Sequence, residues 1–181
     1  LPDESCNVAW ALESVGYAGD KSRFLDEAFR LLRPGGRIVV ADAFLTQPRS
    51  SLSRDDLDIV APFERGWALA PLASVGEFAG DLQQAGFVRV TPRDVTAHVI
   101  PSSKRMHRAG LLLLPFARLL RRLGLCTPMQ LHACEAAHAQ YAARRRGIGA
   151  YVIFSAQRPG RPASPQPGAS LGPEAAAAQP F

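Results

Sequence analysis

The sequence has few residues that could cross-link the chain or hold a metal. It contains three cysteines among 181 residues, Cys6, Cys126 and Cys134, and they form neither a Cys-x-x-Cys pair nor an even disulfide framework. That usage is typical of a reducing compartment, so we expect the protein in the cytoplasm. His132 and His138 lie near Cys134, but position 132 is turned away from position 134 on a helix and no further ligand is nearby. No metal is therefore expected.

The sequence also lacks a long uncharged apolar run. The most apolar segment, around Leu111, is far shorter than the roughly 20 residues that span a bilayer. Charge is uneven: residues 1–94 contain ten Lys and Arg against fourteen Asp and Glu, whereas residues 95–181 contain eleven against two. The basic residues of the second half are spread mostly among helical apolar residues and lack the interleaved aromatics of a base-stacking surface, so no nucleic-acid partner is expected. A solvated face, an anionic substrate and a membrane surface remain as interpretations.

What is present is an alternation of short apolar segments and amphipathic ones, which indicates an α/β fold. The first strand, helix and strand form a unit whose crossover is expected to be right-handed. Strands are expected over residues 6–12, 37–44, 87–91 and 151–156. Helices are expected after Asp20, after Ser74, over residues 109–125 and from Thr127 towards Arg146.

Three segments depart from this alternation. Residues 45–71 are polar apart from Pro62, Phe63 and Trp67, which favours an active-site loop. Within residues 92–149 a long helical insertion separates the last two strands, and such a segment can close over a ligand as a lid. Residues 158–181 are rich in Pro, Gly and Ala, so a disordered tail is expected to follow a domain of residues 1–157.

A set of motifs resembles a known family. Leu1-Pro-Asp-Glu-Ser5, Asn7-Val-Ala-Trp-Ala-Leu-Glu-Ser14 and Leu32-Arg-Pro-Gly-Gly-Arg-Ile-Val-Val-Ala-Asp42 together resemble the fourth-strand to fifth-strand region of class I S-adenosylmethionine-dependent methyltransferases. The later segments Arg93-Asp94-Val-Thr and Tyr151-Val-Ile-Phe-Ser-Ala156 are similar to the methyltransferase type 11 branch, which includes tocopherol and sterol C-methyltransferases. The resemblance implies a Rossmann-like sheet of parallel strands with a final antiparallel strand, a helical lid, and S-adenosylmethionine as the cofactor.

One family feature has no counterpart in the sequence. The glycine-rich loop that holds the methionine end of the cofactor should follow a strand and open a helix. Only Gly35-Gly36 and Gly147-Ile-Gly149 come close, and neither has that context. Because the chain also opens on a strand without an initiator Met, we expect a C-terminal fragment of a methyltransferase that is inactive by itself.

The resemblance also implies roles for residues near the first strand. The backbone at Trp10, Ala11 and Leu12 is expected to border the cofactor, and Glu13 is expected to face the reaction centre as a catalytic residue. His98 and His107 are further catalytic candidates, because a histidine can serve as the general base that deprotonates an acceptor.

The acceptor is expected to be a small, apolar molecule, methylated on carbon, oxygen or nitrogen. Tyr17, Phe44 and Trp67 are candidates for the walls of its pocket, with aromatic rings that also suit a sulfonium. Residues 109–125 combine an apolar surface with a cationic edge, as helices lying on membranes do, so a lipid-like acceptor and a peripheral membrane contact are open alternatives.

Two other functions stay open at this point. The chain could be a non-catalytic binding module that keeps the lid for lipid or partner binding. A nucleic-acid methyltransferase would need an Asn/Asp-Pro-Pro-aromatic segment after the first strand, and Glu13-Ser-Val-Gly-Tyr17 does not supply one. The sequence makes no prediction of the oligomeric state.

Overall fold

A four-stranded sheet organises the chain in the order β1-β2-β4-β3, in a computed structural model that describes residues 1–161. The strands are β1 (Cys6–Leu12), β2 (Leu32–Leu45), β3 (Val88–Asp94) and β4 (Gly149–Gln157). β1 pairs in parallel with β2, whereas β4 runs antiparallel to both β2 and β3. The expected α/β class, with parallel strands and a final antiparallel strand, is confirmed.

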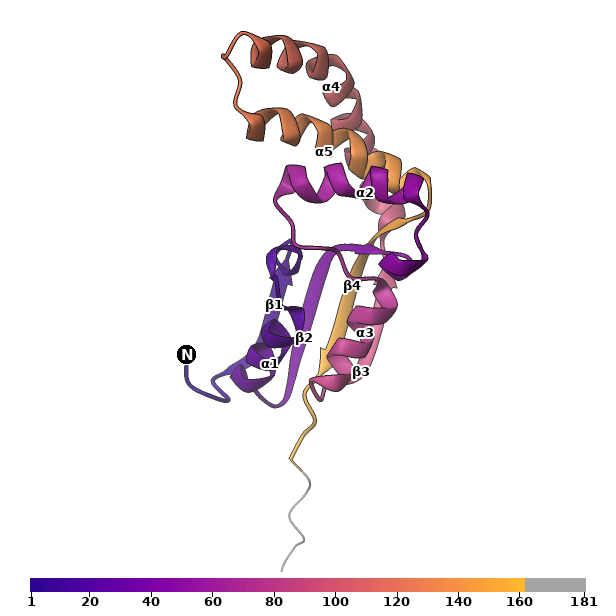
Figure 1. Ribbon diagram of the computed structural model, residues 1–181. Helices are drawn as coiled ribbons and strands as arrows, with labels where there is room; N and C mark the ends of the chain where they lie inside the picture. Colours follow the sequence, from indigo (N-terminus) through magenta and orange to yellow (C-terminus); the bar gives the residue numbers. More distant parts are fainter. Residues whose placement is uncertain (162–181) are drawn as a thin grey trace, which may run out of the picture.

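Two helices, α1 (Lys21–Leu31) and α3 (Val75–Gln84), cover one face of this sheet (Figure 1). Both begin where the sequence predicts, because the Asp20 side chain accepts a hydrogen bond from the Arg23 N–H and Ser74 forms a capping box with Glu77. The residues buried between helices and sheet alternate with more exposed ones along β2 and β4, as a half-buried sheet requires, and others come from the two helices. They include Leu25, Ile38, Val40, Phe44, Phe78, Leu82, Val152 and Phe154.

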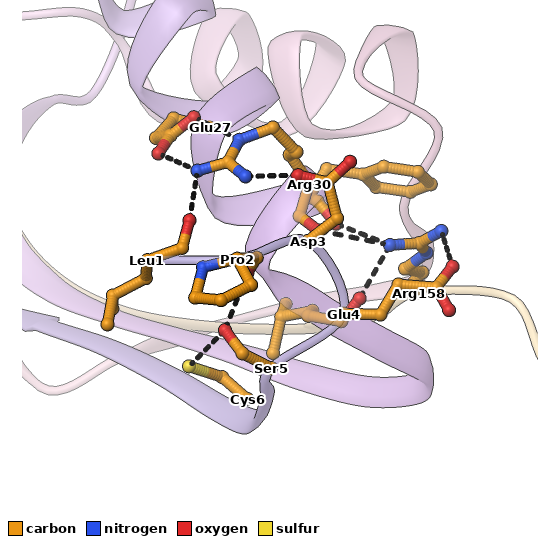
Figure 2. A network of polar contacts seen from close by, with 11 residues as sticks. Leu1, Pro2, Asp3, Glu4, Ser5, Cys6, Glu27, Arg30 and Arg158 are labelled. Carbon is orange, nitrogen blue, oxygen red and sulfur yellow. Dashed lines mark hydrogen bonds and ion pairs between the residues drawn. The ribbon is translucent and has the colours of Figure 1, made fainter.

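The opening residues are tied to the end of α1 by two arginines (Figure 2). Arg30 donates to the carbonyl oxygen of Leu1 at 3.1 Å. Arg158 donates to the carbonyl oxygen of Phe29 at 2.8 Å and forms an ion pair with Glu4 at 2.9 Å. A cation at the C-terminal carbonyls of a helix is favourable. Ordered contacts therefore extend past the expected boundary at residue 157, and most of the expected tail, residues 162–181, lies outside the described residues.

The expectation of a loop over residues 45–71 is wrong for most of its length. Residues Arg54–Trp67 form α2, which begins with a capping box between Ser53 and Asp56. Val60, Phe63 and Glu64 are buried along one side of this helix at helical spacing. The prediction failed because three aspartates, a proline at position 62 and a glycine at position 66 obscured that periodicity.

Two long helices, α4 (Thr96–Arg122) and α5 (Pro128–Arg145), form an antiparallel hairpin beyond the sheet (Figure 1). α5 lies on α2 and α4 lies on α5, so the three helices stack outward from one end of the strands. The predicted start of α5 is confirmed, with Thr127 and Gln130 in a capping box and Pro128 in the first turn. α4 begins at residue 96, well before the expected residue 109, and includes Pro101 and Pro115. None of the helices within residues 1–161 is long and apolar enough to cross a membrane.

Candidate functional site

A cavity of about 250 Å³ lies at the end of the sheet where β1 and β2 terminate, beneath the stacked helices. Its walls include Glu13, Tyr17, Asp42, Phe63, Trp67 and Met106. These residues come from the ends of β1 and β2, from the 3₁₀ turn η1 (Val15–Tyr17), from α2 and from α4. The carboxyl edge of parallel strands is where open α/β sheets bind ligands.

Glu13 occupies a strained position directly after β1. Its φ angle of 48° lies in the left-handed region, which costs a residue with a Cβ roughly 1–2 kcal/mol. The backbone N–H of Glu13 nevertheless donates to the carbonyl oxygen of Ala41 at 2.9 Å, so the pairing with β2 fixes this conformation. Strain of this kind gathers at functional sites, where the surrounding structure holds it.

A hydrogen bond joins Glu13 to the beginning of the final strand, β4. The Tyr151 hydroxyl donates to Oε1 of Glu13 at 3.1 Å. Burial, followed by the charge of Glu13, raises the pKa of Tyr151, so the phenol stays protonated and remains a donor at neutral pH. The bond therefore fixes the direction of the carboxylate that lines the cavity.

Arg144 places a half-buried positive charge beside this pair. Burial lowers the pKa of its guanidinium, while the negative charge of Glu13 acts in the opposite direction. An arginine remains charged at neutral pH in spite of such a shift. Its guanidinium donates to the hydroxyl of Ser103 and, at 3.4 Å, to Oε1 of Gln140. Arg144 thus connects α4 and α5 next to the cavity.

Asp42 holds the turn that presents Tyr17. Its side chain is buried, and it accepts hydrogen bonds from the backbone N–H groups of Gly16 at 2.9 Å and Ala43 at 2.8 Å. Hydrogen bonds from backbone N–H groups to a carboxylate are charge-assisted and therefore strong. The end of β2 and the turn after β1 are therefore locked together at the cavity.

The structure brings some of the predicted site residues together and separates others. Glu13, Tyr17 and Trp67 line the same cavity. Phe44 is 2% exposed, and its ring centroid lies 5.0 Å from that of Phe78 and 5.1 Å from that of Phe154. Its expected role in an acceptor wall is corrected to a place in the core, because alternation along β2 turns its side chain towards α3.

The residues expected to border the cofactor lie along β1 outside the cavity. Ala11 is buried in the core, whereas Trp10 is 75% exposed and Leu12 is 57% exposed. Trp10 and Ala11 line a separate groove of about 160 Å³ against α1, which is walled mainly by apolar side chains. Their expected role concerned the backbone, and it stays a prediction.

The two histidine candidates do not reach the cavity. His98 is exposed in the first turn of α4. The His107 ring stacks on that of His138 with centroids 4.5 Å apart and lies 4.7 Å from Tyr141, so it faces α5. Neither histidine lines the space beside Glu13, and the expectation that they act there is corrected.

Sequence reasoning did not identify Tyr151 or Arg144. A signal for Tyr151 existed, because an antiparallel final strand must begin at the edge where β1 and β2 end. In the observed register Tyr151 lies opposite Ala43, the residue after Asp42. Arg144 is the first of three consecutive arginines, and the sequence does not indicate which of them lies next to the cavity. Only the packing of α5 determines that.

Comparison with known proteins shows what this chain is similar to. A family model described as a methyltransferase domain matches residues 1–40. The chain is 35% identical over 101 residues to the 27-O-demethylrifamycin SV methyltransferase of Amycolatopsis mediterranei, with 56% of this chain and 36% of that protein covered. It is 32% identical over 105 residues to the 2-methyl-6-phytyl-1,4-hydroquinone methyltransferase of Synechocystis sp., with 56% and 33% covered. The matched region thus spans about a third of these relatives.

Solved structures share the fold. The geranyl diphosphate C-methyltransferase of Streptomyces coelicolor, in complex with Mg²⁺, geranyl diphosphate and S-adenosyl-L-homocysteine, superimposes with a TM-score of 0.60 at 21% identity. The superposition covers 86% of this chain and 47% of that one. A putative sarcosine dimethylglycine methyltransferase from Galdieria sulphuraria gives a TM-score of 0.62 at 16% identity, covering 88% and 55%.

Proposed function

We propose that the chain is part of a class I S-adenosylmethionine-dependent methyltransferase, which the family match and the named relatives support, and that its cavity holds the small acceptor that the whole protein methylates. The observation that supports this most directly is the position of Glu13. It is an ordered carboxylate at the carboxyl edge of the sheet, within a cavity whose other walls are largely aromatic and apolar. Relatives with matching sequence are named as methyltransferases of a rifamycin and of a hydroquinone.

Some of the cavity residues bind the acceptor, and others accept or position its proton. Tyr17, Phe63 and Trp67 provide flat apolar surfaces that align an acceptor and exclude water. Glu13 accepts a hydrogen bond, or the departing proton, from an acceptor hydroxyl or amine. Tyr151 keeps the carboxylate pointed at that atom. We class Glu13 as the catalytic residue and Tyr151 as its positioning residue.

S-adenosylmethionine, when bound, supplies a methyl group on a positively charged sulfur. The chemistry of the cavity suits that charge, because aromatic faces and a carboxylate both stabilise a cation. The groove beside Trp10 offers apolar walls for a further part of the cofactor but few polar side chains. Since the matched region spans about a third of the relatives, turnover is proposed for the whole protein and acceptor binding for this chain.

Acceptor binding can be measured by tryptophan fluorescence. The sequence has two tryptophans, so the variant Trp10→Phe leaves Trp67 as the single reporter inside the cavity. We expect a saturable change in emission when small phenols or prenyl alcohols are added. Tyr17→Ala should weaken that binding by roughly tenfold, a typical loss for one buried aromatic contact. Tyr141→Phe, which alters a tyrosine whose ring packs against His107 away from the cavity, is the control and should bind as before.

The outcomes separate the possible functions. Emission that does not change with any phenol or prenyl alcohol would contradict an acceptor site in this cavity. Transfer of a labelled methyl group from S-adenosylmethionine, measured in the same samples, tests the prediction that this chain alone is inactive. A whole protein that binds acceptors but never methylates one would support the non-catalytic binding module instead.

A further inference from the structure

The outer side of α4 displays an apolar stripe. Leu112, Phe116, Leu119 and Leu123 follow one another at intervals of four, three and four residues, which places them on one line along a helix. Their exposed fractions are 74%, 66%, 54% and 62%. Leu125 and Met129, in the turn to α5, extend the exposed surface to the end of the hairpin. We call residues 111–129 the hairpin tip.

This stripe does not face the rest of the fold. The opposite side of α4 packs on α5 through small residues, since Gly110 and Ala117 are buried there. A Cβ at Gly110 would lie 3.2 Å from the carbonyl oxygen of Cys134. α4 is therefore apolar on two sides, and only the side towards α5 is used within residues 1–161.

The charges around the stripe are of one sign. Residues 96–129 contain six cationic residues and no acidic residue. Arg121 and Arg122 lie directly beside the stripe and are exposed. The cations of this segment are Lys104, Arg105, Arg108, Arg118, Arg121 and Arg122. An apolar stripe flanked by arginines is the pattern of a helix that lies in the interface of an anionic membrane.

The position of the hairpin tip suits contact with a flat surface. Figure 1 shows the turn between α4 and α5 at the end of the molecule farthest from β3 and α1. A bilayer could therefore meet the stripe without meeting the sheet. A second copy of the chain is a less suitable partner, because its tip would bring a like set of positive charges against this one.

We propose that the hairpin tip docks on the surface of an anionic lipid bilayer, with Leu112, Phe116, Leu119 and Leu123 inserted at the level of the headgroups. Arg121 and Arg122 would then contact lipid phosphates. This contact does not depend on methyl transfer, so it can be tested whether or not the chain has activity.

Co-sedimentation of the full chain with vesicles tests this proposal. Vesicles that contain phosphatidylglycerol should bind the protein at low salt, and vesicles of phosphatidylcholine alone should bind it roughly tenfold more weakly. Raising the salt concentration should weaken the first interaction. The double variants Phe116→Ser/Leu119→Ser and Arg121→Glu/Arg122→Glu should each reduce binding to the anionic vesicles by about tenfold or more.

Two controls alter the same chemistry elsewhere. Arg23→Glu/Arg37→Glu makes the same change in net charge at two exposed positions on α1 and β2, and Trp10→Ser removes an exposed apolar side chain from β1. Both should bind like the wild type, and circular dichroism confirms that each variant is folded. Loss of binding in the controls, or wild-type protein that remains in the supernatant, would overturn the proposal. A dimer in light scattering that Phe116→Ser/Leu119→Ser abolishes, without vesicle binding, would assign the stripe to a second copy instead.

Discussion

Gly66 lies where α2 approaches α5 closely, and adding one methyl group there should separate the helices. A Cβ at Gly66 would lie 2.2 Å from the carbonyl oxygen of His132 and 2.5 Å from the Cβ of Ala136. Carbon atoms in contact normally stand about 3.5–4.0 Å apart. Both neighbours belong to rigid parts of α5, so no side chain can rotate away. In Gly66→Ala the two helices must move apart by a distance on the order of 1 Å.

The cost of that movement can be compared with the gain in helix propensity. Overpacking a well-filled interface typically costs about 1–3 kcal/mol, with the upper end expected here because backbone is involved. Alanine in place of glycine gains about 1 kcal/mol within a helix. The expected net loss is on the order of 1–2 kcal/mol, which lowers Tm by roughly 2–8 °C for a domain of this size.

Thermal unfolding followed by circular dichroism measures the effect, and Gly80→Ala is the matched control. Gly80 lies within α3, where an added Cβ would meet nothing within 4 Å. The control should therefore raise Tm, while Gly66→Ala lowers it. Since α2 also bears Trp67, the emission of that residue should shift in Gly66→Ala and not in Gly80→Ala. If Gly66→Ala were as stable as the control, the close approach of α2 and α5 would be refuted.

Three further predictions concern single side chains. Phe44→Ala should lower the free energy of unfolding by about 3–5 kcal/mol in urea titrations, as a core phenylalanine does; a small loss would return Phe44 to the acceptor wall. Burial, and then His107, lower the pKa of His138, so the folded state binds fewer protons than the unfolded state and stability should fall as the pH drops below about 6.5. His138→Phe keeps the stacked ring and should lessen this loss in Tm between about pH 7.5 and 5.5; an unchanged pH profile would contradict it. Glu13→Gln should lower the rate of methyl transfer by the whole protein about 100-fold. Tyr151→Phe should lower that rate less and should change its dependence on pH. Equal rates in the wild type and both variants would exclude Glu13 from the chemistry.

Helix starts were predictable wherever a side chain caps the helix. The side chains of Asp20, Ser74 and Thr127 each accept a hydrogen bond from the backbone N–H three residues later, and α1, α3 and α5 begin as predicted. α4 follows Val95, which makes no side-chain capping bond, so the sequence had no local signal for its first turns. α2 did have such a signal, because Ser53 caps its first turn. This cap is stronger evidence for a helix than the proline and glycine within it are against one.

Some residues of the candidate site could be predicted from their neighbours in the sequence, whereas others depend on contacts between distant segments. Glu13 and Tyr17 follow β1 directly, so the end of a strand was enough to place them. Tyr151 is 138 residues away from Glu13, and their hydrogen bond exists because β4 runs antiparallel to β2 and brings Tyr151 opposite Ala43. His107 was a candidate because of its residue type, and residue type does not determine where a side chain lies relative to the sheet. A general base in an α/β fold is therefore better sought among residues that start or end a strand at the carboxyl edge than among the histidines of a helical insertion.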